Sequence, residues 1–146
     1  MKFNVHELSK NNRKSFGNNI DIAIFRIIRY MDLDRYLGKS ANMIIYQCGK
    51  SFGKSLELSS IEDIIKFCEK FKIGKVEIVN KEPLKIRVYE CISCSGLPDV
   101  GETLCYFEGG FIAGCLENLL NKKVIAKETH CAGLGHDFCQ FDIRLL

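Results

Sequence analysis

The chain has 146 residues, a length typical of one compact domain that buries its own core without disulfide bonds. Hydrophobic residues make up 47% and charged residues 27%, which excludes a disordered protein, and no apolar run reaches the roughly 18 residues of a membrane span. The net charge of +3 is too small to indicate a nucleic-acid partner. The first residues contain no apolar signal-peptide core, so we expect a cytoplasmic protein.

The first half of the chain predicts three helices. Apolar residues recur at helical spacing over residues 18–31, 40–52 and 61–71. The segment Ser59-Ser60-Ile61-Glu62 resembles a capping box at the start of the third helix. We expect residues 1–17 to form a mobile N-terminal segment of a single domain that spans residues 1–146.

The second half of the chain changes its periodicity. Four strands are predicted over residues 75–79, 84–89, 123–129 and 138–145, with a helix over residues 102–120. Glycines inside that helix, Gly109, Gly110 and Gly114, indicate that another element or a ligand packs close to its backbone. The order of elements predicts an α+β fold, in which the N-terminal helices pack on an antiparallel sheet.

The eight cysteines favour metal or redox chemistry, because the chain is expected to lie in a reducing compartment. Cys48, Cys68 and Cys115 lie on apolar helix stripes, which predicts core packing. Cys131 and Cys139 flank a glycine turn between two predicted strands, where two thiolates can face one soft cation. The further ligands could be Glu128, His130, His136, Asp137 or other cysteines, and spacing alone does not choose among them.

Two stretches of the second half carry a resemblance to a known family. The stretch 105–120 contains the glycine helix, the stretch 124–141 contains the cysteine turn, and both resemble the 4-vinyl reductase domain family. Gly49 and Gly53, four residues apart, match a further motif of that family. The resemblance implies an α+β ligand-binding fold related to nitric-oxide-sensing haem domains and to Golgi-transport tethering subunits. It also implies a homodimer.

The resemblance further implies a set of metal ligands. Related phenol-sensing domains hold zinc with three cysteines and one glutamate, and the matching positions here are Cys105, Glu128, Cys131 and Cys139. Three thiolates and one carboxylate make a closed tetrahedral site, which is typical of structural rather than catalytic zinc. Such a site would join the glycine helix to the C-terminal hairpin.

One motif departs from that pattern. Cys91 and Cys94 form an additional C-x-x-C at the end of a predicted strand. They could bind a second metal, displace Glu128 in a cysteine-only site, or form a redox pair. Because four or more thiolates also suit an iron–sulfur cluster, that cofactor remains an alternative to zinc.

The expected function is a stand-alone, metal-containing domain that binds or senses a small hydrophobic or aromatic molecule and is not an enzyme. The expected pocket is lined by aromatic and aliphatic side chains of the helices: Phe25, Ile45, Tyr46, Phe107 and Phe111. An accessory role in reducing a tetrapyrrole vinyl group is one alternative, although no glycine fingerprint for a nicotinamide cofactor is present. A dimeric adaptor without a ligand is the other.

Overall fold

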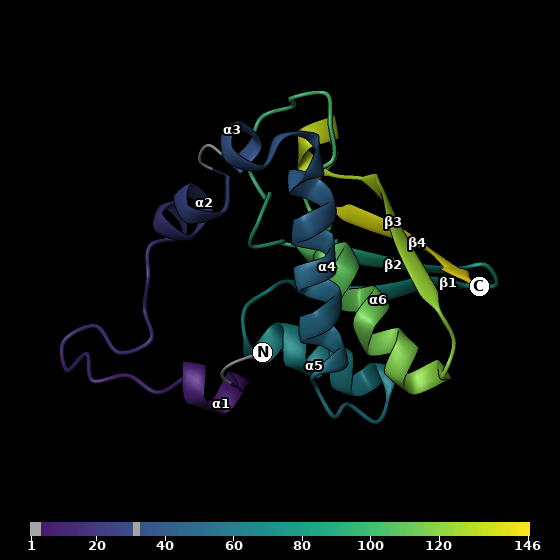
Figure 1. Ribbon diagram of the computed structural model, residues 1–146, viewed down its shortest axis with the longest axis horizontal. Coiled ribbons are helices and arrows are strands. Elements are labelled where there is room, and N and C mark those ends of the chain that lie inside the picture. Colours follow the sequence, from purple (N-terminus) through teal and green to yellow (C-terminus); the bar gives the residue numbers. More distant parts are fainter. Residues whose placement is uncertain (1–3, 31–32) are drawn as a thin grey trace. The chain divides into compact units, whose positions relative to one another are not determined.

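The computed structural model describes residues 4–30 and 33–146 (Figure 1). The chain divides into two compact units, Met1–Ala41 and Asn42–Leu146. The first unit contains the short helices α1 (Val5–Leu8) and α3 (Leu33–Leu37), the longer helix α2 (Ile22–Tyr30) and a 3-10 turn at Gly38–Ser40. Asn4 caps α1 through a reciprocal pair of hydrogen bonds with Glu7.

The helix predicted over residues 18–31 starts later than expected. It begins at Ile22, because the side chain of Asp21 accepts a hydrogen bond from the backbone N–H of Ala23 (2.8 Å). The predicted end at Met31 lies outside the described residues. The helices α1 and α3 were not predicted, since four or five residues are too few to establish a helical period.

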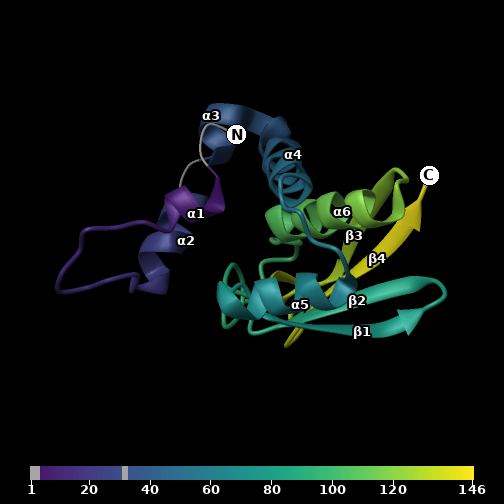
Figure 2. The ribbon, with the colours of Figure 1, turned by 90° about the horizontal axis from the view of Figure 1, so that it is seen from below.

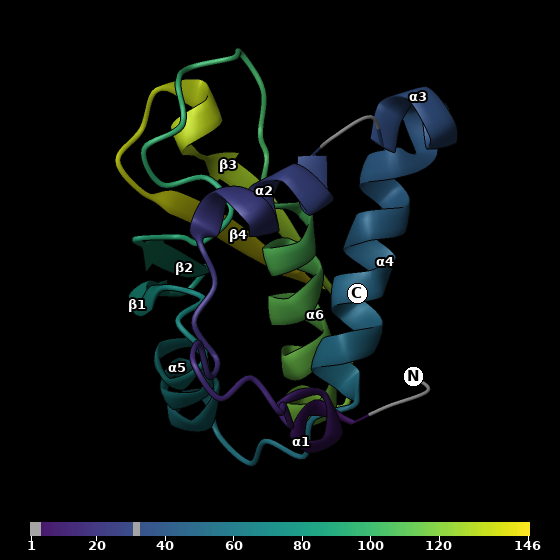
Figure 3. The ribbon, with the colours of Figure 1, turned by 90° about the vertical axis from the view of Figure 1, so that its left-hand side faces the viewer.

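The second unit is an α+β domain. Its helices are α4 (Ala41–Lys54, starting at the last residue of the first unit), α5 (Ile61–Lys70) and α6 (Tyr106–Leu120), and its strands are β1 (Lys75–Lys81), β2 (Leu84–Tyr89), β3 (Val124–His130) and β4 (Cys139–Leu145). Within residues 4–30 and 33–146, these strands form one antiparallel sheet in the order β1-β2-β4-β3. The helices α5 and α6 cover one face of this sheet, and α4 packs across α6 (Figures 2 and 3). The predicted fold class is confirmed.

The glycines of α4 and α6 form the contact between these two helices. A side chain at Gly49 would place its Cβ 2.1 Å from the carbonyl oxygen of Phe107, and one at Gly110 would place it 1.9 Å from that of Tyr46. Gly53 and Gly114 repeat the contact one turn further along. The element that approaches the glycine helix is therefore another helix, as one of the two predicted alternatives required.

This contact corrects the prediction for Cys48, whose side chain is exposed rather than packed in the core. The buried face of α4 is set by the small residues Gly49 and Gly53, which admit α6 closely, and not by the apolar stripe that contains Cys48. Cys68 and Cys115 are both buried, as predicted.

Two helix starts differ from the expected ones in detail. At α5, Ser60 accepts a hydrogen bond from the N–H of Asp63, and Asp63 accepts one from the N–H of Ser59, so the acid of the predicted capping box is Asp63 rather than Glu62. The helix predicted from residue 102 begins at Tyr106, because the N–H groups of residues 100 and 102 are used by the carbonyl oxygen of Gly133.

Side chains from α4 and α6 cover the outer edge of the sheet at β3. Glu117, buried in α6, accepts a hydrogen bond from the N–H of Val124 (2.8 Å) and forms ion pairs with Lys50 (2.7 Å) and Lys54 (2.5 Å). Burial raises the pKa of the Glu117 carboxyl, but the two lysines more than offset this effect and hold that pKa at about 2. Lys50 also donates to the carbonyl oxygen of Val124 (2.9 Å). This protects an edge strand that would otherwise expose unpaired backbone groups.

No helix among the described residues combines the length and the hydropathy needed to cross a lipid bilayer.

Candidate metal centre

The ends of three strands and of one helix bring five cysteines together at one end of the sheet. Cys91 follows β2, Cys131 follows β3, Cys139 begins β4, Cys105 is the residue before α6, and Cys94 lies in the loop between β2 and α6. The antiparallel register places the end of β2 beside the start of β4, where Val88 pairs with Cys139. The end of β3 also meets the start of β4, where His130 pairs with Gln140.

The sulfur atoms of this cysteine cluster (Cys91, Cys94, Cys105, Cys131 and Cys139) are buried and close to one another. Each of these side chains is at most 2% exposed. The sulfur of Cys105 is 3.5 Å from that of Cys139, 3.6 Å from that of Cys91 and 3.9 Å from that of Cys131. Two thiolates on one tetrahedral zinc, with Zn–S distances of about 2.3 Å, lie about 3.8 Å apart. The spacing therefore suits a single ion between the sulfurs.

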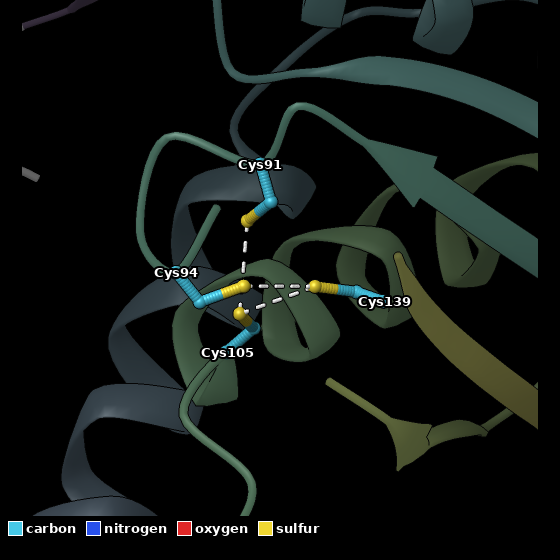
Figure 4. Close-up of side chains that lie close together, drawn as sticks. All are labelled: Cys91, Cys94, Cys105 and Cys139. Carbon is cyan, nitrogen blue, oxygen red and sulfur yellow. Dashed lines mark hydrogen bonds between the residues drawn. The ribbon is translucent and has the colours of Figure 1, made fainter. Parts of the chain in front are cut away.

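Four of these side chains converge in Figure 4, with Cys94 and Cys139 the closest pair at 3.1 Å. All five cysteines are free thiols in this structure. Cys105 stands immediately before the first turn of α6, where unpaired backbone N–H groups favour a thiolate over a thiol.

Backbone and side-chain hydrogen bonds hold the Cys91–Cys94 segment in place without using the sulfur atoms. The N–H of Ser95 donates to the carbonyl of Cys91, and the N–H of Ile92 donates to that of Ile73 (both 2.9 Å). The hydroxyl of the fully buried Ser93 donates to the buried carboxylate of Glu108 in α6. The segment is thus fixed to the first turns of the helix that Cys105 precedes.

The turn between β3 and β4 is equally ordered. The carbonyl of Cys131 accepts hydrogen bonds from the N–H groups of Leu134 and His136 (both 3.0 Å), which closes a 3-10 turn at Ala132–Leu134. Gly135 ends this turn with φ of +78°, a left-handed conformation that favours glycine. A Cβ at Gly133 would lie 2.4 Å from the carbonyl of Glu102, so the turn requires glycine there as well.

Glu128 joins the cluster from the side of β3. Its Oε2 accepts a hydrogen bond from the N–H of Cys105 (2.9 Å), whereas its Oε1 is buried and has no hydrogen-bond partner. Burial, followed by the negative charge of Cys131, raises the pKa of this carboxyl to about 9. A buried carboxylate oxygen without a partner is costly, and a cation at the cluster would supply one. The residues present therefore fit a metal ion.

The thiols themselves show uneven proton affinity. Hydrogen bonding, chiefly from Cys105, lowers the pKa of Cys94 to about 4 and that of Cys131 to about 6. The pKa of Cys105 is raised, first by its hydrogen bond with Cys131, because it is the donor to neighbouring thiolates. The cluster thus holds negative charge in a buried place, which is the electrostatic condition of a cation site.

Among the described residues, six potential ligands form two overlapping groups of four. One group is Cys91, Cys94, Cys105 and Cys139, and the other is Cys105, Glu128, Cys131 and Cys139. Within each group the ligand atoms lie within 4.8 Å of one another. The structure therefore brings together all four residues of the predicted zinc set, and it places the C-x-x-C pair against the same two cysteines.

The sharing of Cys105 and Cys139 was not predicted from the sequence. The signal that could have indicated it is the strand register, since a cysteine just after β2 and one at the start of β4 must meet if these strands pair. The histidines considered as ligands are in neither group. His130, His136 and Phe138 stack together instead, with ring centroids 4.6 to 6.0 Å apart.

A cavity of about 860 Å³ borders the cluster. Most of its accessible wall is apolar, and its lining includes Tyr46 of α4, Tyr106 and Gly109 of α6, and residues of β3 and β4 such as Ile125, Ala126, Phe141 and Ile143. Cys105 and Glu128 also line it. The cavity and the candidate metal centre therefore share two residues.

Of the residues predicted to line a pocket, Tyr46 lines this cavity. The others lie elsewhere: Phe107 and Phe111 pack with Phe52 at ring distances of 6.1 and 5.6 Å, Ile45 is not part of the cavity wall, and Phe25 belongs to α2 of the first unit. Tyr46 also accepts a hydrogen bond from the N–H of Ala126 (3.1 Å), which places its ring at the sheet edge.

Comparison with known proteins identifies relatives in sequence and in structure. The model of the vinyl-4-reductase domain matches residues 84–145. An uncharacterized protein of Methanocaldococcus jannaschii is 49% identical, over 91% of this chain and 83% of the relative. A vinyl-4-reductase family protein from the same organism has a similar structure, with a TM-score of 0.72 and 24% identity over 97% of this chain and 88% of that one.

Three further structures share the fold at lower identity. The phenol-responsive sensory domain of the transcription activator PoxR, solved with phenol, has a TM-score of 0.62 and 13% identity over 86% of this chain and 75% of that one. An H-NOX protein from S. oneidensis gives 0.53 and 14% over 94% and 78%, respectively. A trafficking protein particle complex subunit 3 from Naegleria fowleri, covalently bound to palmitic acid, gives 0.51 and 18% over 86% and 89%. The predicted kinship with haem-sensor and tethering-subunit folds is confirmed.

Proposed function

The chain belongs to the vinyl-4-reductase domain family, and from that premise we propose that it is a small-molecule-binding domain of the sensory type whose cysteine cluster holds a metal ion. The observation that carries the proposal is the shared wall between cavity and cluster. Cys105 and Glu128 line the cavity and are also potential metal ligands. A molecule in the cavity therefore contacts the residues that would hold the ion, so that binding is coupled to the geometry of the metal.

The proposed metal is zinc, with Cys105, Glu128, Cys131 and Cys139 as its ligands. The unpartnered Oε1 of Glu128 supports this set, because coordination gives that oxygen the partner it lacks. Four protein ligands leave no open position, so the ion would cross-link the start of α6 to β3 and β4 and perform no reaction. An iron–sulfur cluster at the same cysteines is the alternative cofactor.

The kind of ligand follows from the cavity wall. Its apolar surface, with Glu128 and the hydroxyl of Tyr46 as polar groups, suits a small aromatic or aliphatic molecule with one polar end. The sensory domain solved with phenol shares the fold, and so does the subunit bound to palmitic acid. Phenol and palmitate are therefore suitable probes.

Titration of metal-replete, anaerobically purified protein with phenol and with palmitate tests the proposal. We expect one probe to bind, and Ile143→Trp, which fills the cavity, to weaken that binding at least 10-fold without loss of metal. Met43→Trp makes a comparable change at an exposed position of α4 and should leave binding unchanged. Unfolding measurements establish that both variants are folded.

The contrary outcomes identify the alternatives. If neither probe binds and a native mass spectrum of the purified protein contains no small molecule, the domain is an adaptor without a ligand. If the spectrum contains a tetrapyrrole, the accessory role in vinyl reduction replaces the proposed function.

A further inference from the structure

The cysteine cluster offers more ligands than one tetrahedral ion can take. Five thiols and the carboxylate of Glu128 lie around one point of the described structure, whereas zinc in a structural site takes four ligands. The six donors do not form a single group. They form two groups of four that have Cys105 and Cys139 in common.

Two tetrahedra that share an edge require this arrangement. Each ion then has two ligands of its own and two that it shares with its neighbour. The shared pair, Cys105 and Cys139, has a sulfur–sulfur distance of 3.5 Å, close to the roughly 3.8 Å edge of a zinc–thiolate tetrahedron. Cys105 lies near a ligand of each group, at 3.6 Å from Cys91 and 3.9 Å from Cys131, as a bridging sulfur must.

A single ion leaves part of the cluster unsatisfied in either group. An ion held by Cys91, Cys94, Cys105 and Cys139 leaves the buried Oε1 of Glu128 without a partner. An ion held by the other group leaves the thiols of Cys91 and Cys94 against metal-bound sulfurs, with Cys94 only 3.1 Å from Cys139 (Figure 4). Two ions give every donor a metal partner.

The additional ligand pair is also held in place independently of any ion. Cys91 and Cys94 lie on either side of Ser93, whose hydroxyl is bonded to Glu108 of α6, and the N–H of Ser95 closes the turn on the carbonyl of Cys91. A ligand pair that is already ordered loses little conformational entropy when it binds a cation. The C-x-x-C segment thus has the properties of a prepared half-site.

From these observations we propose that the centre binds two divalent ions of the zinc class, bridged by the thiolates of Cys105 and Cys139. Cys91 and Cys94 complete one ion, and Cys131 and Glu128 complete the other. The inference rests on the proposed function in one respect, namely that the cluster binds metal at all. It adds the number of ions, the bridging roles, and a function for the C-x-x-C motif.

The number of ions per chain tests the inference. Apoprotein is prepared under reducing, anaerobic conditions, titrated with Zn2+, and examined by native mass spectrometry. The wild-type chain should retain two ions. Replacing the terminal ligands of one half, by Cys91→Ser with Cys94→Ser or by Cys131→Ser with Glu128→Gln, should leave one ion. Cys48→Ser, at an exposed cysteine outside the cluster, should leave two.

Cobalt substitution gives a second measurement that does not depend on the variants. Two Co2+ ions joined by bridging thiolates are magnetically coupled, so the magnetic moment per ion should be lower for the doubly loaded chain than for the singly loaded one. One ion per wild-type chain, or two ions without coupling, overturns the bridged centre while leaving a metal site. Iron with acid-labile sulfide also overturns it. A chain that binds no metal overturns the proposed function as well.

Discussion

The two ends of α6 are joined to the sheet by different chemistry. At its start, Cys105 and the N–H of that residue meet the cysteines and Glu128. Near its end, Glu117 meets Lys50, Lys54 and the backbone of β3. The first end contains buried negative charge that requires an external cation, whereas the second contains cations supplied by the chain itself. Stability at the first end should therefore depend on metal, and stability at the second should not.

The largest effect is expected from Cys105→Ser. Cys105 belongs to both ligand groups, so its loss disrupts each of them. Structural zinc contributes about 10 kcal/mol or more to the folding of small peptides, and a domain with its own core should lose roughly half of that. Thermal unfolding with and without chelator measures the loss. Cys48→Ser is the matched control, and an unfolding temperature of Cys105→Ser equal to that of the control would contradict a structural metal.

Glu117→Gln breaks the other end. The change removes the charge that both lysines face in a buried place, and breaking a buried ion pair costs about 3 kcal/mol or more. Denaturant unfolding should show this loss to the same extent in metal-loaded and chelator-treated protein. Dependence of the loss on chelator would mean that the two ends are not independent.

Acid should separate the two ends in order. Protons compete with metal for thiolates, so the metal-dependent stability should decline first as the pH falls below neutrality. The pKa of Glu117 is about 2 in the folded chain and about 4.5 when unfolded, so its contribution is complete above pH 4.5 and is lost as the pH falls toward 2. Metal content and unfolding free energy, measured at each pH, should fall in that sequence. Simultaneous loss of both would contradict the distinction.

Gly110→Ala, between the two ends, should have the smallest effect. Its Cβ would lie 1.9 Å from the carbonyl oxygen of Tyr46, so α4 and α6 must move apart. Overpacking typically costs about 1–3 kcal/mol, and the better helix propensity of alanine offsets up to about 1 kcal/mol of this. We expect a net loss of about 2 kcal/mol in denaturant unfolding with unchanged metal content. An alanine at Gly17, where no atom lies within 4 Å of the added Cβ, introduces no such clash.

The periodic elements of the second unit could be predicted from the sequence because their burial follows their hydrophobic pattern. The alternation from Leu84 to Tyr89 and the helical stripe from Ile61 to Phe71 each correspond to an observed element. The helix boundaries were less predictable. Asp21 and the N–H groups of residues 100 and 102 make local hydrogen bonds that depend on geometry, and these bonds decide where α2 and α6 begin.

The candidate site was predictable in its residues but not in its connections. The turn cysteines and Glu128 were found through the resemblance, and the structure places them beside Cys105. The contact of Cys91 and Cys94 with the same pair depends on the register of β2 against β4, which residue spacing does not encode. Likewise, Cys48 is exposed because Gly49 and Gly53 set the packing face, a contact between backbones that hydrophobic periodicity cannot detect.

X-ray absorption at the metal edge of anaerobically purified, unmodified protein tests the central claim most directly. The account predicts a bound transition metal, expected to be zinc, whose nearest neighbours are mostly sulfur at about 2.3 Å. A sample without transition metal, with freely titrating thiols in the cysteine cluster, would contradict it. So would a metal surrounded by nitrogen and oxygen alone, because the buried ligands at this end of the sheet are mainly thiols.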